Sequence, residues 1–336
     1  MRTLVILSLF VAAAAAQDAV IKDGKLDDKM WSLTYEARGL ERGLSTPNPK
    51  KIFEGRAAGS VQIEIIVEEG PKKLDGKGWR KWLTDQMAAK KRALQNVEES
   101  KEGTATLIFN EMKLDIFNEH HGYAFYPRGF QCFVVHAYVA DKTEKSGERI
   151  KQCLGGLKLG KGSGATMYEV IVAARDGLPL NDPRVTLKAG SAYAFQKPGN
   201  LELATQVLER ARKAMKEDTY KVEEQHALFF AGGYAYLAKT PRDTKKAIEW
   251  LSKCEEIAKK LPEQARASSQ AGAAYNLACA YSLDGDTVKG FEALHRAFAE
   301  IMAVDKAHLD GDSDLDNLKK DQANWDKFWK ARVEGR

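Results

Sequence analysis

The residues of this chain best suited to chemistry are the adjacent pair His120-His121 and a third histidine, His136. Together with Glu119 they suggest a metal site or a proton-transfer site, because imidazole and carboxylate groups serve both. Adjacent side chains of a regular strand point to opposite faces, so a strand could not present both members of the pair to one site. The segment Asn118-Glu119-His120-His121-Gly122 is more typical of a polar hairpin turn. We therefore predict no metal ion here.

A second set of candidate ligands is a run of alternating aspartates near the C-terminus. A calcium-binding EF-hand loop requires glycine at its sixth position and a bidentate glutamate at its twelfth. Counted from the first aspartate, those positions hold Leu315 and Asp321, so the match fails at both. We predict that these side chains form helix caps and turns instead. The aspartates are Asp310, Asp312, Asp314 and Asp316.

Sequence motifs for catalysis are missing from the chain. It contains no G-x-S-x-G, no H-E-x-x-H and no complete phosphate-loop motif G-x-x-x-x-G-K-[ST]. The glycine-rich stretch 160–164 follows a predicted helix rather than a strand, which favours a linker over a phosphate-binding loop. We predict no catalytic residue, no cofactor and no enzymatic activity. The alternative is a hydrolase-type enzyme, or a metal- or small-ligand-binding module, with its site in the N-terminal domain around His120 and His136.

The elements that position these histidines form an N-terminal domain over residues 17–160. Residues 60–67 alternate strictly between polar and apolar side chains, as a half-buried strand does. Residues 79–97 carry an apolar stripe at helical spacing that includes Trp79 and Trp82. The order of elements favours an α+β layer built on an antiparallel sheet. Further strands are predicted at 104–109, 112–117, 122–127 and 131–139, and a last helix at 148–157.

This order of strands and helices resembles the photosystem II extrinsic protein P family and its α/β/α sandwich relatives. The resemblance rests on element order across most of the domain, without a diagnostic motif. It implies a sandwich fold. Relatives of that fold mostly act as binding or assembly modules, so the resemblance would name no reaction.

The C-terminal third, residues 182–332, repeats a pattern of small and large residues. In each of three units a small residue precedes a tyrosine by one helical turn, and a small-x3-large-x2-small pattern follows. The first small residues are 43 and then 45 positions apart. Small residues allow helices to approach closely, and the large ones fill the gap. The units contain Gly190, Tyr193, Ala204, Leu208 and Ala211; Gly233, Tyr236, Ala247, Leu251 and Cys254; and Ala278, Tyr281, Gly290, Leu294 and Ala297.

These units resemble the tetratricopeptide repeat, whose signature is Gly/Ala-x2-Tyr followed by a small and then a large residue. The segment from His308 through Trp325 to Phe328 is similar to the closing segment of such arrays, which covers the open end of the stack. The resemblance implies an all-α repeat domain with a C-terminal cap. Its tyrosines, such as Tyr236 and Tyr281, are then expected in the core.

Members of this repeat family bind extended peptides on the face made by the first helix of each unit. The positions that map to this face are mostly apolar or aromatic, so a clamp for a terminal carboxylate is not expected. The resemblance therefore implies a protein or peptide partner. Packing of this face on the chain's own N-terminal domain stays open as an alternative. The positions are Arg184, Leu187, Ser191, Phe230, Tyr234, Leu237, Tyr275, Cys279 and Ser282.

The joint between the two domains is predicted at residues 161–181. Lys161-Gly162-Ser163-Gly164 has the composition of a hinge, and an apolar helix follows from Thr166 to Arg175. That helix either ends the sandwich or begins the repeats. The four cysteines, Cys132, Cys153, Cys254 and Cys279, form no C-x-x-C pair. Whether the first two or the last two form disulfides stays open.

Composition and the N-terminus limit the partners and the compartment. The net charge is +5 with both signs interleaved, so we predict no nucleic-acid binding. Residues 1–16 have the order of a secretory signal peptide: a basic start, the apolar run 4–11 and an Ala-x-Ala site. The apolar run is shorter than the roughly 18 residues of a membrane span. We expect an exported protein, periplasmic or extracellular, without stable membrane insertion.

The export prediction has a direct test. If residues 1–16 are removed after translocation, N-terminal sequencing of the exported protein should begin near Gln17. Exported material that still begins at Met1 would show that the segment is not cleaved.

Overall fold

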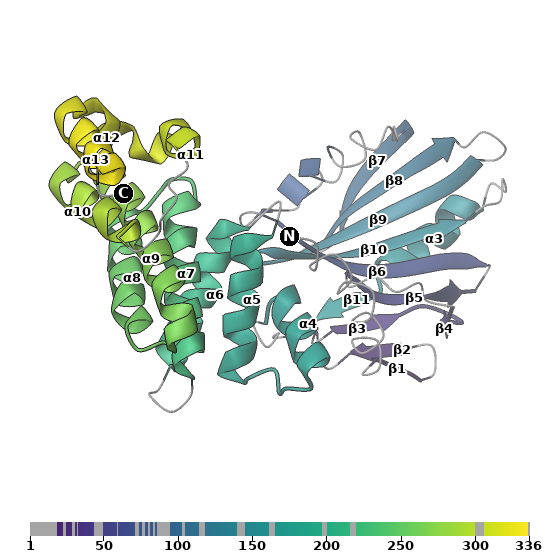
Figure 1. The fold of residues 1–336 in the computed structure, drawn as a ribbon. Coiled ribbons are helices and arrows are strands. Elements are labelled where there is room, and N and C mark those ends of the chain that lie inside the picture. The colour runs from purple at the N-terminus through teal and green to yellow at the C-terminus, as the bar shows by residue number, and fades with distance from the viewer. Residues whose placement is uncertain are drawn as a thin grey trace. The chain divides into compact units, whose positions relative to one another are not determined.

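The chain divides into two compact units, Met1–Leu180 and Asn181–Arg336, and each is described here by itself (Figure 1). The computed structural model describes residues 19–22, 25–28, 31, 33–43, 50–58, 60–70, 74–75, 78–79, 81–82, 85, 95–102, 105–113, 118–139, 145–160, 165–196, 200–215, 220–299 and 306–334. The predicted signal peptide and the glycine-rich joint at 161–164 lie outside the described residues.

Two antiparallel sheets form the first unit. The larger has the strand order β4-β5-β6-β10-β9-β8-β7 and the smaller the order β1-β2-β3-β11. The strands are β1 (Ala19–Lys22), β2 (Lys25–Asp28), β3 (Leu33–Glu36), β4 (Glu41–Arg42), β5 (Lys51–Ala57), β6 (Val61–Glu69), β7 (Gln95–Glu102), β8 (Ala105–Lys113), β9 (Asn118–Arg128), β10 (Gln131–Val139) and β11 (Leu157–Leu159).

The core of this unit lies between the two sheets, as the alternation of residues 60–67 predicts. Every second residue of β6 from Val61 to Val67 is buried, and the side chains between them face the other way. Leu33 and Tyr35 of the smaller sheet join the same core, together with the helix α3 (Ser146–Leu154). The Tyr35 hydroxyl donates a hydrogen bond to the Cys153 carbonyl at 2.6 Å. The predicted α+β class with an antiparallel sandwich is thus confirmed.

The helix α4 (Met167–Asp176) belongs to this first unit by its packing. Thr166 and Glu169 form a capping box at its N-terminus. Met167 and Val170 are buried in the core between the sheets. In addition, the Glu69 carboxylate accepts hydrogen bonds from the Met167 backbone N–H at 2.7 Å and from the side-chain amide of Gln131 at 2.9 Å. The helix therefore ends the sandwich rather than beginning the repeats.

Two local predictions in this unit are wrong. The segment 118–122 is not a hairpin turn but the start of β9, which runs without interruption to Arg128 and pairs with β8 and β10. The helix predicted for 79–97 does not reach its predicted end, because β7 begins at Gln95. β7 is an edge strand, and edge strands carry charged residues that obscure the alternation of buried and exposed positions.

The second unit consists of antiparallel helix pairs followed by a short closing segment (Figure 1). The first helices of the pairs are α5, α7 and α9, and the second helices are α6, α8 and α10. Their bounds are α5 (Pro183–Phe195), α6 (Leu201–Ala214), α7 (Val222–Ala238), α8 (Thr244–Ala258), α9 (Glu263–Asp284), α10 (Thr287–Ala297), α11 (Lys306–Gly311), η1 (Ser313–Leu315), α12 (Asp316–Lys320) and α13 (Gln322–Glu334).

The turn between the two helices of a pair repeats through all three pairs. Asn200, Asp243 and Asp286 are the N-caps of α6, α8 and α10, at intervals of 43 residues. Each side chain accepts a hydrogen bond from the backbone N–H three residues later, which satisfies a donor that the helix leaves open. Each cap residue's own N–H donates to the carbonyl of the preceding repeat tyrosine, namely Tyr193, Tyr236 or Tyr281.

Close approach of the helices in the first two pairs depends on glycine, as the repeat pattern predicts. A Cβ atom built on Gly190 would lie 2.6 Å from Leu208 Cγ, and one on Gly233 would lie 2.5 Å from Leu251 Cγ. Both leucines are completely buried. The large residue of each second helix thus fills the space that the glycine leaves. Tyr236 is buried as expected, whereas Tyr281 is only half-buried.

The closing segment covers the last pair with apolar side chains. Leu318 packs against Gly290, and Phe328 is fully buried. Asp312 caps η1, and Asp314 pairs with Arg242 at 2.7 Å. These two aspartates therefore act as cap and ion-pair partner, and no group of metal ligands is found among the described residues.

The four cysteines are free thiols within buried surroundings. Cys132 and Cys153 pack on opposite faces of the larger sheet, so these two cannot form a disulfide without rearranging the sheet. Burial raises the pKa of the Cys153 thiol to about 11. A search of the described helices finds none with both the length and the apolar character needed to cross a bilayer.

The glycine contacts predict opposite effects for two similar substitutions. Gly233→Ala places a methyl group against Leu251 and should lower the free energy of unfolding by about 1–3 kcal/mol. Gly272→Ala in α9 meets only Phe230, at an ordinary 3.7 Å, and should raise stability by about 0.5–1 kcal/mol through helix propensity. Thermal melts of both variants provide the measurement. Equal effects would show that the helices are not held this close.

Candidate functional site

A row of aromatic rings on the first helices, here called the aromatic strip, reaches the surface of the second unit. It consists of Phe195 from α5 and of His226, Phe230 and Tyr234 from α7. The three α7 residues are four positions apart and therefore share one side of that helix. The strip thus runs along one side of α7 and includes Phe195 at the end of α5.

Stacked contacts run along the strip. The ring of Phe195 lies 5.2 Å from that of Tyr234 and 6.2 Å from that of Phe230, with interplanar angles of 30° and 27°. His226 stacks on Phe230 at 6.0 Å. Such offset rings form a fixed apolar surface, because each ring restricts the rotamers of the next. Burial lowers the pKa of His226, so this imidazole is neutral at pH 7 and keeps the strip uncharged.

Phe195 is unusual in its exposure. Its side chain is 50% exposed, and among the described residues the other large hydrophobic side chain with high exposure is Val288 of α10. Val288 has none of the ring contacts that surround Phe195. Phe195 is half-exposed and stacks on two half-buried aromatics. Covering this apolar surface with another apolar group is therefore favourable in free energy.

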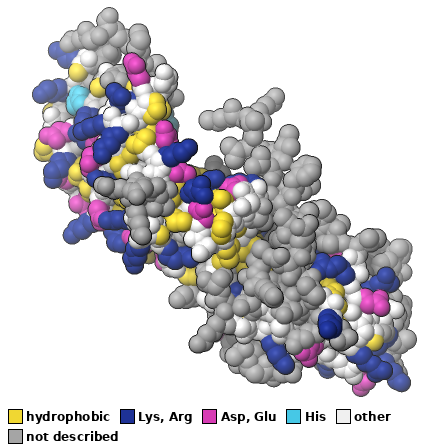
Figure 2. All heavy atoms as spheres, turned by 90° about the horizontal axis from the view of Figure 1, so that it is seen from below, with side chains coloured by type: hydrophobic (Ala, Val, Ile, Leu, Met, Phe, Trp, Pro, Cys, Tyr) yellow, Lys and Arg dark blue, Asp and Glu magenta, His cyan; other side chains and the backbone are white. Residues whose placement is uncertain are grey.

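The remainder of α5 adds polar groups beside the strip. Arg184, Lys188, Ser191 and Phe195 recur every three to four residues and so form one stripe. Arg184 is paired with Asp182 through contacts of 3.0 and 2.6 Å. The stripe thus passes from basic side chains at the start of α5 to an aromatic one at its end. Figure 2 shows hydrophobic side chains among intermixed basic and acidic ones on one face of the helical unit.

The structure divides the predicted groove residues into two groups. Phe230 and Tyr234 lie in the strip, and Arg184 and Ser191 lie on the stripe beside it. Three others are interior positions: Leu187 is 4% exposed, Leu237 is 3% exposed and Ser282 is fully buried. The prediction for these three is wrong, because their side chains are buried in the packing between helices. They are not offered as binding residues.

Tyr275 and Cys279, the two remaining predicted groove residues, are held by the closing segment. The Tyr275 hydroxyl donates a short hydrogen bond to the Asp312 carboxylate and lies 3.4 Å from His308 Nε2. Cys279 contacts the same carboxylate. Phe195, by contrast, is not among the predicted groove residues, although its position four residues after Ser191 places it on the same stripe.

A second candidate site lies in the first unit, where a chain of polar side chains crosses the outer face of the larger sheet. Glu64 of β6 is directly opposite His136 of β10, and the two side chains are 3.1 Å apart. His136 Nε2 is 2.9 Å from His121 Nδ1 of β9. At the other end, Lys51 donates to Glu64 at 2.7 Å. A bulge in β5 between Lys51 and Phe53 lets both Ile52 and Phe53 enter the core.

The contacts of His136 with Glu64 and His121 are consistent with one arrangement of neutral tautomers in the two rings. If His136 Nδ1–H donates to Glu64, its Nε2 is an acceptor, and His121 Nδ1–H must donate to it. Tyr123 and Tyr138 stack on His136 at 4.5 and 5.0 Å and hold the ring in place. The hydrogen bond from His136, assisted by Lys51, lowers the pKa of Glu64 to about 2 although burial opposes this. Of the adjacent histidines, His121 is the one that contacts His136. The contact joins two paired strands and does not lie in a turn.

Comparison with known proteins leaves the chain without an assigned family. No family model matches the sequence, and no curated protein matches it significantly. A solved structure from Bacteroides thetaiotaomicron is similar to 65% of this chain and 80% of its own, with 9% sequence identity and a TM-score of 0.32. A likeness at this level supports no conclusion about function.

The lowered pKa of Glu64 predicts a pH-dependent contribution to stability. Its folded pKa lies below the unfolded value of 4.5, so the contribution is present above pH 4.5 and is lost as the pH falls towards 2. Glu64→Gln should lower the free energy of unfolding by about 1–2 kcal/mol at pH 7, and the difference should shrink between pH 4.5 and 2.

Denaturant unfolding at several pH values measures this difference. Glu68→Gln is the matched control on the same strand, because its partner Lys50 is 44% exposed and the pair should contribute less than about 0.5 kcal/mol. A difference between Glu64→Gln and the unsubstituted protein that is the same at pH 7 and pH 2.5 would contradict the account.

Proposed function

We propose that this protein is an exported, non-enzymatic interaction scaffold of the tetratricopeptide type, which binds a segment of a partner protein through the aromatic strip. The observation that carries the proposal is Phe195, half exposed yet stacked on Tyr234 and Phe230. Aromatic side chains dominate the energetics of protein interfaces, because they bury a large area at a small cost in conformational entropy. The repeated helix pairs supply a rigid support for this surface.

The chemistry of α5 defines the class of partner. Lys188 and Phe195 are seven positions apart, which corresponds to about 10 Å along a helix. An extended peptide covers a similar distance in about three residues. The partner segment therefore has an aromatic or large apolar side chain that covers Phe195 and Tyr234. An acidic side chain about three residues away meets the basic end of the stripe.

The histidine chain supports a second candidate function in the first unit. Glu64, His136 and His121 are connected by hydrogen bonds of 3.1 and 2.9 Å, an arrangement that can orient an imidazole for proton transfer or ligand binding. Under this candidate, His136→Gln would abolish binding or turnover of a small ligand while leaving peptide binding by the second unit unchanged. The two functions are thus separable by one substitution.

Selection from a random peptide display library tests the main proposal. We expect enrichment of peptides that combine an aromatic or large apolar residue with an acidic residue about three positions away. Phe195→Ala and Tyr234→Ala should each weaken binding of a selected peptide by about tenfold, measured by fluorescence anisotropy. Neither change should alter the thermal melt by more than a few degrees, because both side chains lie at the surface.

Val288→Ala is the matched control, since it removes another exposed hydrophobic side chain, 69% exposed, outside the strip. It should leave the affinity unchanged. If the library yields no enriched motif, or if selected peptides bind the Phe195→Ala variant as tightly as the unsubstituted protein, the strip is not the binding surface.

A further inference from the structure

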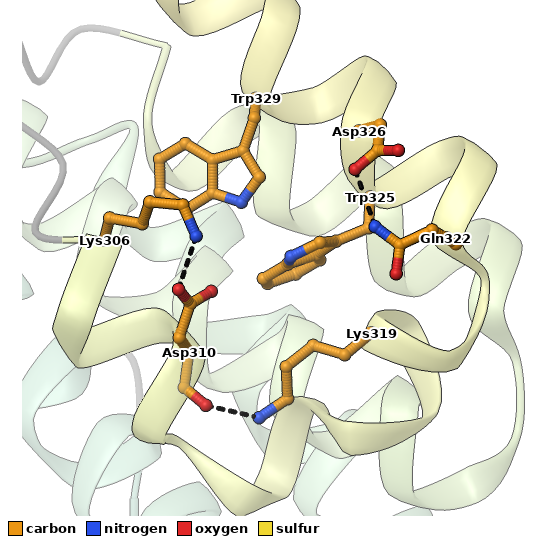
Figure 3. Close-up of a pocket in the computed structure, with 7 residues that line it drawn as sticks. All are labelled: Lys306, Asp310, Lys319, Gln322, Trp325, Asp326 and Trp329. Carbon is orange, nitrogen blue, oxygen red and sulfur yellow. Dashed lines mark hydrogen bonds and ion pairs between the residues drawn. The ribbon is translucent and has the colours of Figure 1, made fainter.

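The closing segment contains a pocket that the proposed peptide site does not use. Its volume is about 400 Å³, within the range of cavities that hold small molecules. Figure 3 shows its lining side chains, which come from α11, α12 and α13. They are Lys306, Asp310, Lys319, Gln322, Trp325, Asp326 and Trp329.

Two tryptophans form adjoining walls of this pocket. The rings of Trp325 and Trp329 are 6.1 Å apart and nearly perpendicular, at 83°. Trp325 is held by the core of the cap, where it is 5% exposed and stacks on the buried Phe328. Perpendicular indoles with a carboxylate nearby resemble in chemistry the aromatic cages that bind ammonium groups, because the faces of the rings attract positive charge.

The ammonium group of Lys306 already lies against one of these indoles. The Lys306 amine lies 5.1 Å from the centre of the Trp329 ring and forms an ion pair with Asp310 (Figure 3). The Lys306 side chain is 62% exposed, so it can leave for solvent at little cost. The Asp310 carboxylate would then be available to a cation that enters in its place.

Two other polar side chains of the pocket, Lys319 and Gln322, already have partners within the protein. Lys319 pairs with Asp316 at 2.7 Å and donates to the carbonyls of Asp310 and Asp312, both at 2.9 Å. The Gln322 amide donates to Asp326 at 2.7 Å. Exchange of the Lys306 ammonium for another cation would therefore leave the framework of the pocket intact.

One donor in the pocket has no acceptor among the described residues. The indole Nε1–H of Trp329 is buried and makes no hydrogen bond to any of them. A buried donor without a partner costs about 1–3 kcal/mol, which a ligand oxygen would recover. The cation that fits this pocket thus also carries a hydrogen-bond acceptor.

We propose that this pocket binds a small alkylammonium compound with an oxygen acceptor a few bonds from its nitrogen. The ammonium replaces that of Lys306 between Trp329 and Asp310, and the oxygen accepts the hydrogen bond from Trp329 Nε1–H. The site lies in the cap and is independent of the aromatic strip, so either proposal can fail without the other.

Titration of the full-length protein with choline and with glycine betaine, followed by calorimetry, tests this site. Two matched probes separate its parts: 3,3-dimethylbutan-1-ol is the uncharged analogue of choline, and tetramethylammonium lacks the oxygen. We expect millimolar or tighter binding of choline or betaine, with each matched probe about tenfold weaker. Binding of the uncharged analogue as tightly as choline would overturn the cation site.

The variants Lys306→Met and Asp310→Asn give the sharpest distinction. Lys306→Met removes the internal competitor and should tighten binding of choline about three- to tenfold, whereas Asp310→Asn should weaken it by a similar factor. Thermal melts of both variants confirm that they are folded. Unchanged or weaker binding by Lys306→Met would show that Lys306 is part of the framework and that the pocket has no exchangeable ammonium position.

Discussion

The contact between Gly233 and Leu251, with its equivalent between Gly190 and Leu208, determines the organisation of the helical unit. With only 2.5 to 2.6 Å between a would-be Cβ and the leucine, a larger residue fits at these positions only if the leucine side chain or its helix moves. The close approach brings the two helices of the first and second pairs together along one side. The aromatic strip lies on another, half-buried side of these helices, where Phe230 of α7 faces Gly272 of α9.

The same constraint limits how many side chains the first helices can offer to a partner. In α7, Leu237 is in the core, while Phe230 and Tyr234 are half-buried at the surface. The strip is thus a narrow row of rings. Such a row suits one extended segment of a partner better than a flat protein surface, which would need a larger area.

The first unit combines a buried core with a polar chain on the outer face of the same sheet. Trp79 covers part of this face by packing in one cluster with Phe125 of β9 and Val134 of β10. Beyond that cluster, the face carries Glu64 and His136, whose side chains are 23% and 15% exposed. Partly buried charges of this kind cost desolvation free energy, which the hydrogen bonds from Lys51 and His136 offset. The outer face of the larger sheet therefore carries a polar site beside its apolar cluster.

The success of sequence reasoning depended on how far apart the interacting residues are in the chain. The glycine-leucine pairs and the N-caps recur at 43 residues, so their periodicity alone predicts the helix pairs. The buried and exposed faces of the helices were harder to predict. Leu187 and Ser191 are one turn apart, and only the packing of neighbouring helices decides which of them is buried. The histidine chain depends on strand register: Glu64 meets His136 through pairing across 72 residues, which no local pattern contains. Charges in β7 likewise obscured an edge strand.

Hydrogen–deuterium exchange of the full-length protein with and without a saturating selected peptide tests the central claim most directly. If the partner segment lies on the aromatic strip, exchange should slow in α5 and α7 around Phe195 and Tyr234 and stay unchanged in α10 around Val288. Slower exchange confined to α10 or to the strands of the first unit, with α5 and α7 unaffected, would contradict it.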